Sequence, residues 1–346
     1  MRLVRQPLLL WIFLAITLTG CLPSSCNRVE PRTISPADSL SRALAETMSV
    51  DTLQLVSSTP VDRDDFRSPR TVQFFGENGL VVTDTRSHTL HYLSASDSVV
   101  RSIELPGSIP YLAGVEGDSV WVFAPGDGSV RLFVDGEQRD SLGVDLGSGN
   151  ERALTWLVRV DSGFVSKVLD DDSGNHLGFH DTSGTMLHRI ELPAASWRYA
   201  GFLRPDEGRL LSLAGFLPWI YTVEDGKLDS LRLNGYDSPM LARTLQFELG
   251  TTEQPPLLSA AADPAGEWLF LLNMRPGWLH VDVYDRTATL RYILTQPDPS
   301  FDTDFYPSDL AVRETAPGAF ELVVTVTEPE TRVDRYRWTM PGSVTP

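Results

Sequence analysis

The chain has 346 residues, of which 42% are hydrophobic, and its 46 acidic and 29 basic residues give a formal net charge of −17 at pH 7. This amount of apolar side chain can bury a large core, which excludes a mini-protein held together by disulfides or a metal ion. The acidic excess repels phosphate backbones, so we expect no nucleic-acid partner. The 24 prolines and 26 glycines are spread along the chain and predict many turns.

The first 20 residues have the layout of a secretory signal peptide, with Arg2 and Arg5 before an apolar run over residues 8–18. This run is shorter than the ~20 residues that a membrane-spanning helix needs. The segment Leu18-Thr19-Gly20-Cys21 resembles the lipobox of bacterial lipoproteins, in which the cysteine thiol receives diacylglycerol. The resemblance implies that Cys21 is lipidated and holds the chain on a membrane surface. An ordinary cleaved signal peptide is the alternative.

Two residues after the lipobox bear on location and on disulfides. Leu22 stands where an aspartate would retain a lipoprotein in the inner membrane, which resembles sorting to the outer membrane. We therefore expect a protein of the cell envelope, lipid-anchored outside the cytoplasmic membrane and most simply on the outer membrane, facing the periplasm or the cell surface. Cys26 is the other cysteine, and a lipidated Cys21 leaves it without an internal partner. It is expected to be a free tether thiol, with intermolecular pairing as the alternative.

Residues 21–50 are expected to form a tether that contains one short helix. Ser35 can cap this helix, Pro36 suits its first position, and Asp38 suits its first turn. The 3.6-residue period places four apolar side chains on one face, which we expect to dock on the following domain. They are Leu40, Ala43, Leu44 and Met48.

From residue 51 the chain repeats one pattern six times: an apolar strand, a turn, a second strand, a polar loop, an alternating third strand, a turn and a fourth strand. The first turns of the units centre on Asn78, Gly117, Ser162, Glu207, Pro264 and Pro317. The expected fourth strands cover 99–105, 138–144, 186–192, 227–233 and 289–294. The sixth unit has no fourth strand of its own, because the chain ends soon after its third strand.

Four-stranded units repeated about every 40–60 residues predict an all-β fold, a six-bladed β-propeller of antiparallel blades over residues 51–340, followed by a tail at 341–346. No helix is expected between the units. The segment 51–56 is predicted to pair beside the third strand of the last unit, 332–338. This pairing would complete the last blade and remove an open sheet edge.

Residues 80–93 resemble an NHL-type blade, in which an apolar strand is followed by Asp, a short polar loop with His, and another strand. Asp84 and His88 match that pattern, and the other five units keep only the strand pattern. The chain is thus similar to bacterial lipoproteins with a six-bladed propeller of the NHL/TolB-like superfamily. The likeness is one of architecture and implies no particular activity.

A binding rim is expected where the loops between second and third strands meet the connections between units, around one mouth of the ring. Trp, Tyr and Arg dominate binding sites because they bury large area and still make polar contacts. For the three tryptophans, packing between blades is the alternative. Two connections, 234–256 and 296–308, are longer than the fold needs and are natural places for specificity. The candidate rim residues are Asp84, Arg86, His88, Trp197, Arg198, Trp219, Asn273, Arg275 and Trp278.

A metal set is the second candidate site. Six-bladed lactonases of the gluconolactonase kind hold a central divalent cation with acidic and Asn side chains, and the resemblance implies Asp84, Asp170, Asn273 and Glu328 as comparable positions. Asp170, Asp171 and Asp172 with Asn175 also form a candidate Ca²⁺ loop, although the EF-hand spacing is missing. A solvated acidic turn is the alternative there.

No nucleophile elbow, phosphate-binding loop, metalloprotease helix or dinucleotide fingerprint is present, so we assign no catalytic residue. The expected function is a non-catalytic envelope lipoprotein whose propeller binds or scaffolds a protein or glycan partner, without a cofactor. The alternative is a divalent-metal-dependent lactonase or esterase of the gluconolactonase type, with Ca²⁺. A structural spacer without a specific ligand is a third interpretation.

Overall fold

The computed structural model describes residues 36–60, 66–148, 150, 152–275 and 277–342. The expected signal peptide over 1–20, the lipidation site Cys21 and the thiol of Cys26 lie outside these residues and stay predictions. Within the described part, no helix is both long and apolar enough to cross a membrane.

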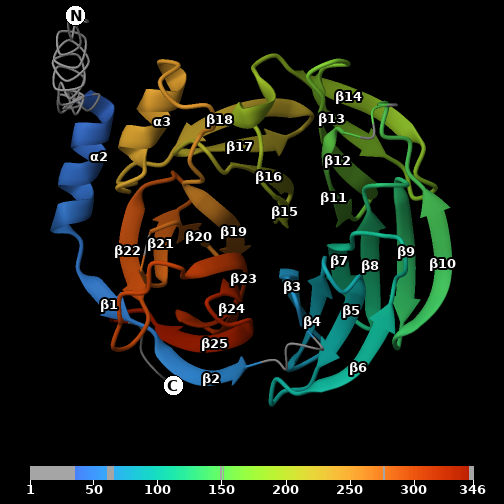
Figure 1. The fold of residues 1–346 in the computed structure, drawn as a ribbon, viewed down its shortest axis with the longest axis horizontal. Helices are drawn as coiled ribbons and strands as arrows, with labels where there is room; N and C mark the ends of the chain where they lie inside the picture. The colour runs from blue at the N-terminus through green and yellow to red at the C-terminus, as the bar shows by residue number, and fades with distance from the viewer. Residues whose placement is uncertain (1–35, 61–65, 149, 151, 276, 343–346) are drawn as a thin grey trace, which may run out of the picture. The chain divides into compact units, whose positions relative to one another are not determined.

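Six sheets stand in a ring around a common axis, as the sequence predicted (Figure 1). Blade 1 is β3 (Pro69–Phe75), β4 (Gly79–Asp84), β5 (Thr89–Leu93) and β6 (Val99–Glu104). Blade 2 is β7 (Tyr111–Glu116), β8 (Ser119–Ala124), β9 (Ser129–Val134) and β10 (Glu137–Gly143). Blade 3 is β11 (Leu154–Val160), β12 (Gly163–Leu169), β13 (Asn175–His180) and β14 (Met186–Leu192).

The second half of the ring repeats this order. Blade 4 is β15 (Leu203–Asp206), β16 (Arg209–Ala214), β17 (Trp219–Glu224) and β18 (Lys227–Arg232). Blade 5 is β19 (Ser259–Ala265), β20 (Trp268–Asn273), β21 (His280–Asp285) and β22 (Leu290–Thr295), with β1 (Val50–Thr52) added outside. Blade 6 is β23 (Tyr306–Ala316), β24 (Ala319–Glu328), β25 (Arg332–Thr339) and β2 (Gln54–Pro60).

Side-chain burial is highest in the second strands and lowest in the outermost strands, and this difference explains the sequence pattern of each unit. Every residue of β12 is buried, because both faces of a second strand pack against neighbouring blades. β10 is an outer strand, and all but one of its residues are exposed. The predicted fourth strand 186–192 agrees with β14, and the other four predicted fourth strands lie within one residue of the observed ones.

The innermost strands of the six blades present backbone N–H groups at the axis, where no further strand pairs with them. Three of these groups are capped by a side chain of the preceding blade, so that one blade is tied to the next. The pairs are Val312 N with Asp263 Oδ2 at 2.7 Å, Val72 N with Asp309 Oδ2 at 2.9 Å, and Leu112 N with Thr71 Oγ1 at 2.9 Å. Polar residues on these strands therefore satisfy a buried sheet edge.

The closing strand divides between two blades. The predicted pairing with the third strand of the last unit is confirmed for β2, which runs antiparallel to β25. It is wrong for Asp51 and Thr52, which belong to β1 and pair in parallel with β22 of blade 5. Leu53 lies between the two strands and is fully buried in the core shared by blades 5 and 6. The buried Leu53 side chain thus marks the point where the chain passes from blade 5 to blade 6.

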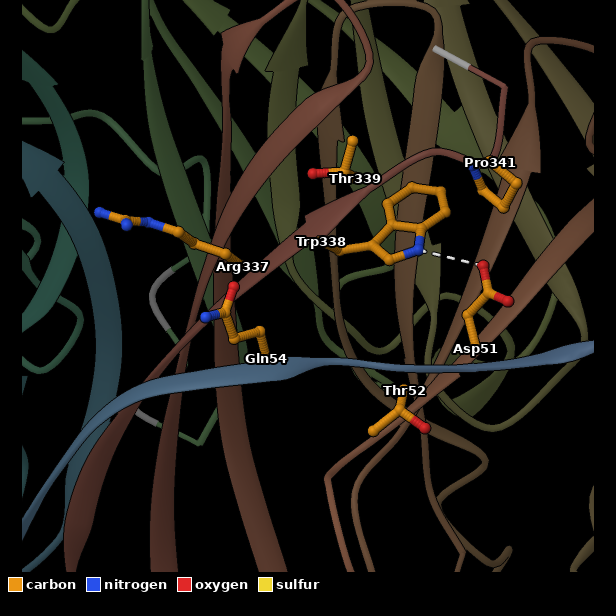
Figure 2. Close-up of a pocket in the computed structure, with 7 residues that line it drawn as sticks. All are labelled: Asp51, Thr52, Gln54, Arg337, Trp338, Thr339 and Pro341. Carbon is orange, nitrogen blue, oxygen red and sulfur yellow. Dashed lines mark hydrogen bonds between the residues drawn. The ribbon is translucent and has the colours of Figure 1, made fainter. Parts of the chain in front are cut away.

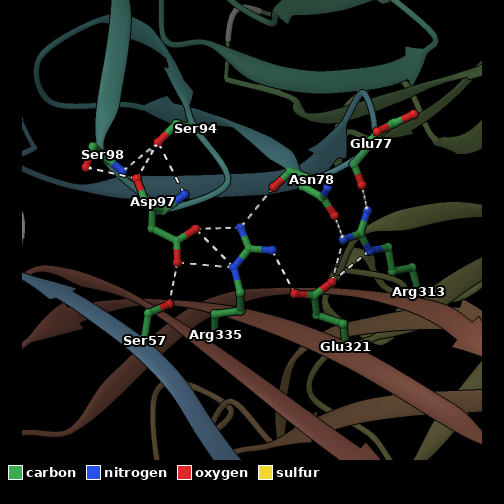
Figure 3. A network of polar contacts seen from close by, with 10 residues as sticks. Ser57, Glu77, Asn78, Ser94, Asp97, Ser98, Arg313, Glu321 and Arg335 are labelled. Carbon is green, nitrogen blue, oxygen red and sulfur yellow. Dashed lines mark hydrogen bonds and ion pairs between the residues drawn. The ribbon is translucent and has the colours of Figure 1, made fainter.

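A buried polar network joins the closing blade to blade 1 (Figure 3). Arg335 on β25 donates to both carboxylate oxygens of Asp97, at 3.0 and 3.1 Å from Nε, and to Glu321 at 2.9 Å. Ser57 of β2 donates to the same Asp97. Although burial acts to raise the pKa of Glu321, hydrogen bonds from Arg335 and Arg313 hold it below its ordinary value. The network ties β2, β24 and β25 to the turns of blade 1.

The expected tether helix is present as α2 (Pro36–Thr47), and half of its predicted face docks. Met48 packs on the core of blades 4 and 5 together with Ala45, and Leu44 lies against Gly235. Leu40 is 73% exposed and Ala43 is exposed, so their predicted places on the docked face are wrong. Asp38 in the first turn pairs with Arg232 of blade 4.

Two helices between the units were not predicted. α3 (Leu241–Glu248) lies in the long connection 234–256, and the short 3₁₀ helix η1 (Ser196–Arg198) lies between blades 3 and 4. The expectation that no helix separates the units is therefore wrong at these two places. Both belong to connections on the same end of the ring.

Candidate functional site

The predicted rim lies at the end of the ring where second strands finish and innermost strands begin. We call this surface the rim face. It comprises the described residues of the loops 85–88, 125–128, 170–174, 215–218, 274–275, 277–279 and 329–331, and of the connections 105–110, 144–148, 150, 152–153, 193–202, 233–258 and 296–305.

Asp84 is the last residue of β4 and is fully buried. Its Oδ2 accepts hydrogen bonds from the backbone N–H groups of Arg67 and Ser68, at 2.5 and 2.8 Å. Its Oδ1 accepts from those of Arg86 and Ser87, at 2.9 and 2.8 Å. Four donors use both oxygens, so the carboxylate ties the loop of blade 1 to the segment that enters the blade.

Asp170 has the same place in blade 3 and a comparable role. Its Oδ1 accepts from Asn150 Nδ2 at 2.8 Å and from the backbone of Asp172 at 3.0 Å. Its Oδ2 accepts from Ser148 at 2.7 Å and from Ser173. The hydrogen bonds from Ser173 and Ser148 hold its pKa well below the usual range. Asp170 is thus buried under a hydrogen-bonded loop, whereas Asp171 and Asp172 beside it are exposed.

Asn273 ends β20 in blade 5 and also binds the preceding connection. Its Nδ2 donates to the backbone oxygen of Asp237 at 3.0 Å and to Asp282 Oδ2 at 2.8 Å. Arg275 donates to the same backbone oxygen and, at 3.3 Å, to the Asp237 carboxylate, which also pairs with Arg42 of α2 at 3.3 Å. Both candidates therefore hold the long connection 234–256 in place.

The metal set does not come together. Glu328 is exposed at the end of β24, while the polar atoms of the other three candidates are engaged within their own blades. Among the described residues, no three His, Cys, Asp or Glu side chains are grouped so that they could hold a metal ion. The residues proposed as Ca²⁺ ligands thus do not fit that ion in this arrangement.

The two other candidates in blade 1 differ in what they offer to a ligand. Arg86 is exposed on the rim face. His88 is half-buried at a positive φ of 56°, and its Nδ1 lies against the backbone oxygen of Ser108 in the next connection. His88 shapes the loop, and Arg86 is the member that faces solvent.

Trp197 and Arg198 lie together on η1 against α3. The Trp197 ring meets Phe247 edge-on at 5.0 Å, and the Arg198 guanidinium lies 4.8 Å from the centre of the Trp197 ring. Arg198 also pairs with Glu248 at 3.0 Å. The predicted rim residues Trp197 and Arg198 are thus half-buried against α3, a helix that the sequence did not predict.

The remaining tryptophans lie at separate places. Trp219 lies 5.8 Å from Arg232, the residue that pairs with α2, and so belongs to the side of blade 4 that the helix covers. Trp278 meets Phe301 edge-on at 6.0 Å across the loop of blade 5 and the connection to blade 6. Both tryptophans are half-buried, and only Trp278 adjoins a strongly exposed ring.

The sequence analysis missed the exposed apolar side chains of the rim face. Phe301 is 63% exposed and lies over Gly277, whose missing side chain leaves room for its ring. Four further large apolar residues of connections or first strand positions are also at least 40% exposed. They are Ile109, Leu154, Leu249 and Tyr306. The signal available in the sequence was a large apolar residue inside a loop otherwise rich in Asp, Pro, Ser and Gly.

Charged and aromatic side chains at the innermost strands pack against one another between blades. Arg204 of blade 4 pairs with Asp263 of blade 5 at 3.3 Å and with Asp309 of blade 6 at 2.7 Å. The Phe202 ring lies between the guanidinium groups of Arg204, at 5.1 Å, and Arg70, at 5.4 Å. The cavity beside Phe202 and Arg204 has a volume of about 10 Å³, which is room for one water molecule at most.

Lys167 is a buried amine without access to solvent. Its Nζ donates to the backbone oxygens of Tyr199 and Leu213 at 2.8 and 3.3 Å and to Ser212 Oγ at 3.1 Å. Burial lowers its pKa well below the ordinary value. These hydrogen bonds join blades 3 and 4. Because the side chain is fully buried, no substrate can reach it, and Lys167 is not a candidate nucleophile.

No protein-family model and no curated protein matches the sequence. Solved structures do match. A calcium-binding protein, regucalcin, from Agrobacterium tumefaciens is 12% identical over 83% of this chain and 95% of its own, with a TM-score of 0.54. Virginiamycin B lyase from Staphylococcus aureus is 10% identical over 82% and 88%, with a TM-score of 0.51. A putative exported protein from Bacteroides fragilis is 10% identical over 84% and 100%, with a TM-score of 0.51. At such identities the likeness shows the fold alone: the chain is a six-bladed β-propeller.

Proposed function

We propose that the protein is a membrane-anchored envelope lipoprotein whose propeller binds a protein partner through the rim face. One observation carries the proposal: five of the eleven large apolar side chains that are exposed among the described residues lie on this face or at the strand starts beside it. Phe301, Ile109 and Leu249 come from three different blade connections, and Leu154 and Tyr306 begin the innermost strands β11 and β23. Single exposed apolar residues are ordinary, but their recurrence at one end of the ring favours an interaction surface there.

The chemistry of this face favours a protein over a glycan. Leucine and isoleucine side chains offer no hydrogen bonds to sugar hydroxyls, but they bury area well against apolar partner residues. Arg86 and the Trp197–Arg198 pair add the residue types that anchor protein interfaces. The rigid ring below holds the connections in place, which lowers the entropy lost on binding.

The alternative function, a Ca²⁺-dependent lactonase, gains no support from the geometry. Three of the candidate ligands are engaged in hydrogen bonds within their own blades, and among the described residues no three acidic, His or Cys side chains are placed to hold a metal ion. The likeness to regucalcin concerns the fold, and it carries no ligand residue over to this chain.

A capture experiment tests the binding role. The full chain is immobilised and incubated with envelope extract, and retained proteins are quantified by mass spectrometry. Phe301→Glu should reduce retention of a specific partner at least tenfold, because it places a charge in an apolar contact. Val100→Glu is the matched control, since Val100 is 66% exposed on β6, away from the rim face. Equal retention by both variants would contradict the proposal.

The anchor has a separate test. The mass of the mature amino-terminal peptide should show diacylglycerol on Cys21, and Cys21→Ser should release the protein from membranes during fractionation. A mature peptide that begins elsewhere, or that carries no lipid, would refute the anchor and leave the binding role open.

A further inference from the structure

The outer edge of the closing blade differs in charge from the other outer edges. Within the strands that the structure describes, β6, β10, β14, β18 and β1 each carry at least one charged side chain, whereas β2 carries none. Charged residues on an edge strand keep other chains from pairing with it. β2 also exposes Leu55 and Val56, at 43% and 42%. In a chain of net charge −17, this is an edge that a like-charged molecule can approach.

A groove of about 320 Å³ opens where β1 passes into β2 (Figure 2). Arg337 and Gln54 lie at one end of this groove, and Asp51 and Pro341 lie at the other. Asp51 accepts one hydrogen bond, from Trp338 Nε1 at 3.2 Å. Within the described residues, Asp51 and Arg337 form no ion pair with each other or with another side chain. The groove thus presents an acid and a base at opposite ends.

We propose that a second copy of this chain docks here, related to the first by a two-fold axis through the groove. A two-fold axis exchanges the ends of the groove, so Asp51 of each copy faces Arg337 of the other. Leu55 and Val56 follow Gln54 and so lie beyond the Arg337 end of the groove, where the axis places them against Val50, 58% exposed, at the start of β1 in the second copy. The acid and the base at opposite ends make this surface complementary to itself in charge. The contact adds to the rim face and leaves it free.

Light scattering after size exclusion of the full chain in detergent measures the mass of the protein part directly. At roughly 10–100 µM we expect a dimer. Arg337→Glu and Asp51→Arg should each give a monomer, because each variant places two like-charged pairs across the axis. An equimolar mixture of the two variants should recover a dimer, since both contacts are then between opposite charges. Thermal unfolding confirms that each variant is folded.

Val56→Lys should also give a monomer, and Val100→Lys on β6 is the matched control that should stay dimeric. A monomeric wild-type chain in this range would overturn the proposal. So would a dimer that survives Arg337→Glu, or a mixture of the two charge variants that fails to associate. If the wild-type chain is a dimer but retains no specific partner, only the rim-face proposal is contradicted. The two proposals can therefore fail independently.

Discussion

At the scale of single residues, polar side chains at strand ends and on inner strands serve to satisfy backbone groups. Asp263 is an example, because it caps Val312 N and pairs with Arg204 close to the axis. Burial raises its pKa to about 7, although Arg204 acts to lower it. The folded chain therefore holds this proton more tightly than the unfolded chain does.

This difference gives a pH dependence with a definite sign. A carboxyl whose pKa is raised by folding stabilises the fold below its unfolded pKa, and that contribution is lost as the pH rises through about 7. Asp263→Asn has no proton to lose. From about pH 5 to about pH 8, the free energy of unfolding should fall by roughly 1–3 kcal/mol less in this variant than in the wild type. Denaturant unfolding at the two pH values measures the difference. Asp304→Asn, at an exposed site, should follow the wild type, and parallel curves for all three proteins would contradict the argument.

The network around Arg335 gives a second prediction at this scale. Arg335→Met leaves the buried carboxylates of Asp97 and Glu321 without their shared cation, which should cost about 3–5 kcal/mol of unfolding free energy. Arg243→Met, on α3 and exposed, should change it by less than about 0.5 kcal/mol. Urea unfolding measures the unfolding free energy of both variants. Equal losses in the two would mean that the network does not stabilise the closed ring.

The sequence located several of these residues but not their roles. Asp84, Asp170 and Asn273 were correctly placed at the starts of corresponding loops. A spacing pattern does not tell whether a carboxylate at a strand end turns toward the axis or back onto its own loop. In the structure all three bind their own loops or the preceding connection, because the backbone N–H and C=O groups there would otherwise lack partners. The exposed ring of Phe301 was missed for the opposite reason, since an apolar residue is expected to be buried.

At the scale of elements, strands were predictable because apolar periods and turn residues are local signals. α3 was missed because its start signal is weak: Met240 at its N-cap makes no side-chain capping bond and the first turn has no acidic residue, although the Ser238 hydroxyl accepts from Met240 N at 3.2 Å. The position of α2 was predicted, but only Leu44 and Met48 of its predicted face dock, since the contacts of a helix face depend on distant residues such as Gly235 that periodicity does not locate. Local pattern thus fixes where an element lies, and tertiary contacts decide how it is turned.

The pivot between β1 and β2 can be tested at the scale of elements. Leu53→Ala should lower the unfolding free energy by about 2–5 kcal/mol, because it opens a cavity in the core where the chain passes from blade 5 to blade 6. Leu187→Ala, 64% exposed on the outer strand β14, should cost much less than Leu53→Ala. Chemical denaturation of both variants is the measurement. A loss of unfolding free energy at Leu53 as small as that at Leu187 would show that Leu53 does not stabilise the closed ring.

At the scale of the whole molecule, ring closure followed from a simple count in the sequence, because five units had four strands and the sixth had three. The site could not be derived in the same way. A binding face is made by connections from several blades, and their relative positions depend on the ring and not on local pattern. For that reason the metal set appeared plausible as a row of corresponding residues, while among the described residues its members are not grouped and three of them bind within their own blades.

The whole molecule should accordingly be indifferent to divalent cations. A ligand at about 100 times its dissociation constant stabilises a fold by about 2.7 kcal/mol, which would raise the melting temperature of a chain of this size by several degrees. Because the oxygens of Asp84 and Asp170 already accept hydrogen bonds from their own loops, we expect less than about 1 °C between millimolar Ca²⁺ and excess chelator. Differential scanning fluorimetry of the full chain measures this shift. A rise of several degrees with Ca²⁺ that is lost in Asp170→Asn would show that the loop rearranges around an ion and would return the hydrolase interpretation to consideration. Without such a rise, the acidic loops act as hydrogen-bonded supports beneath the rim face.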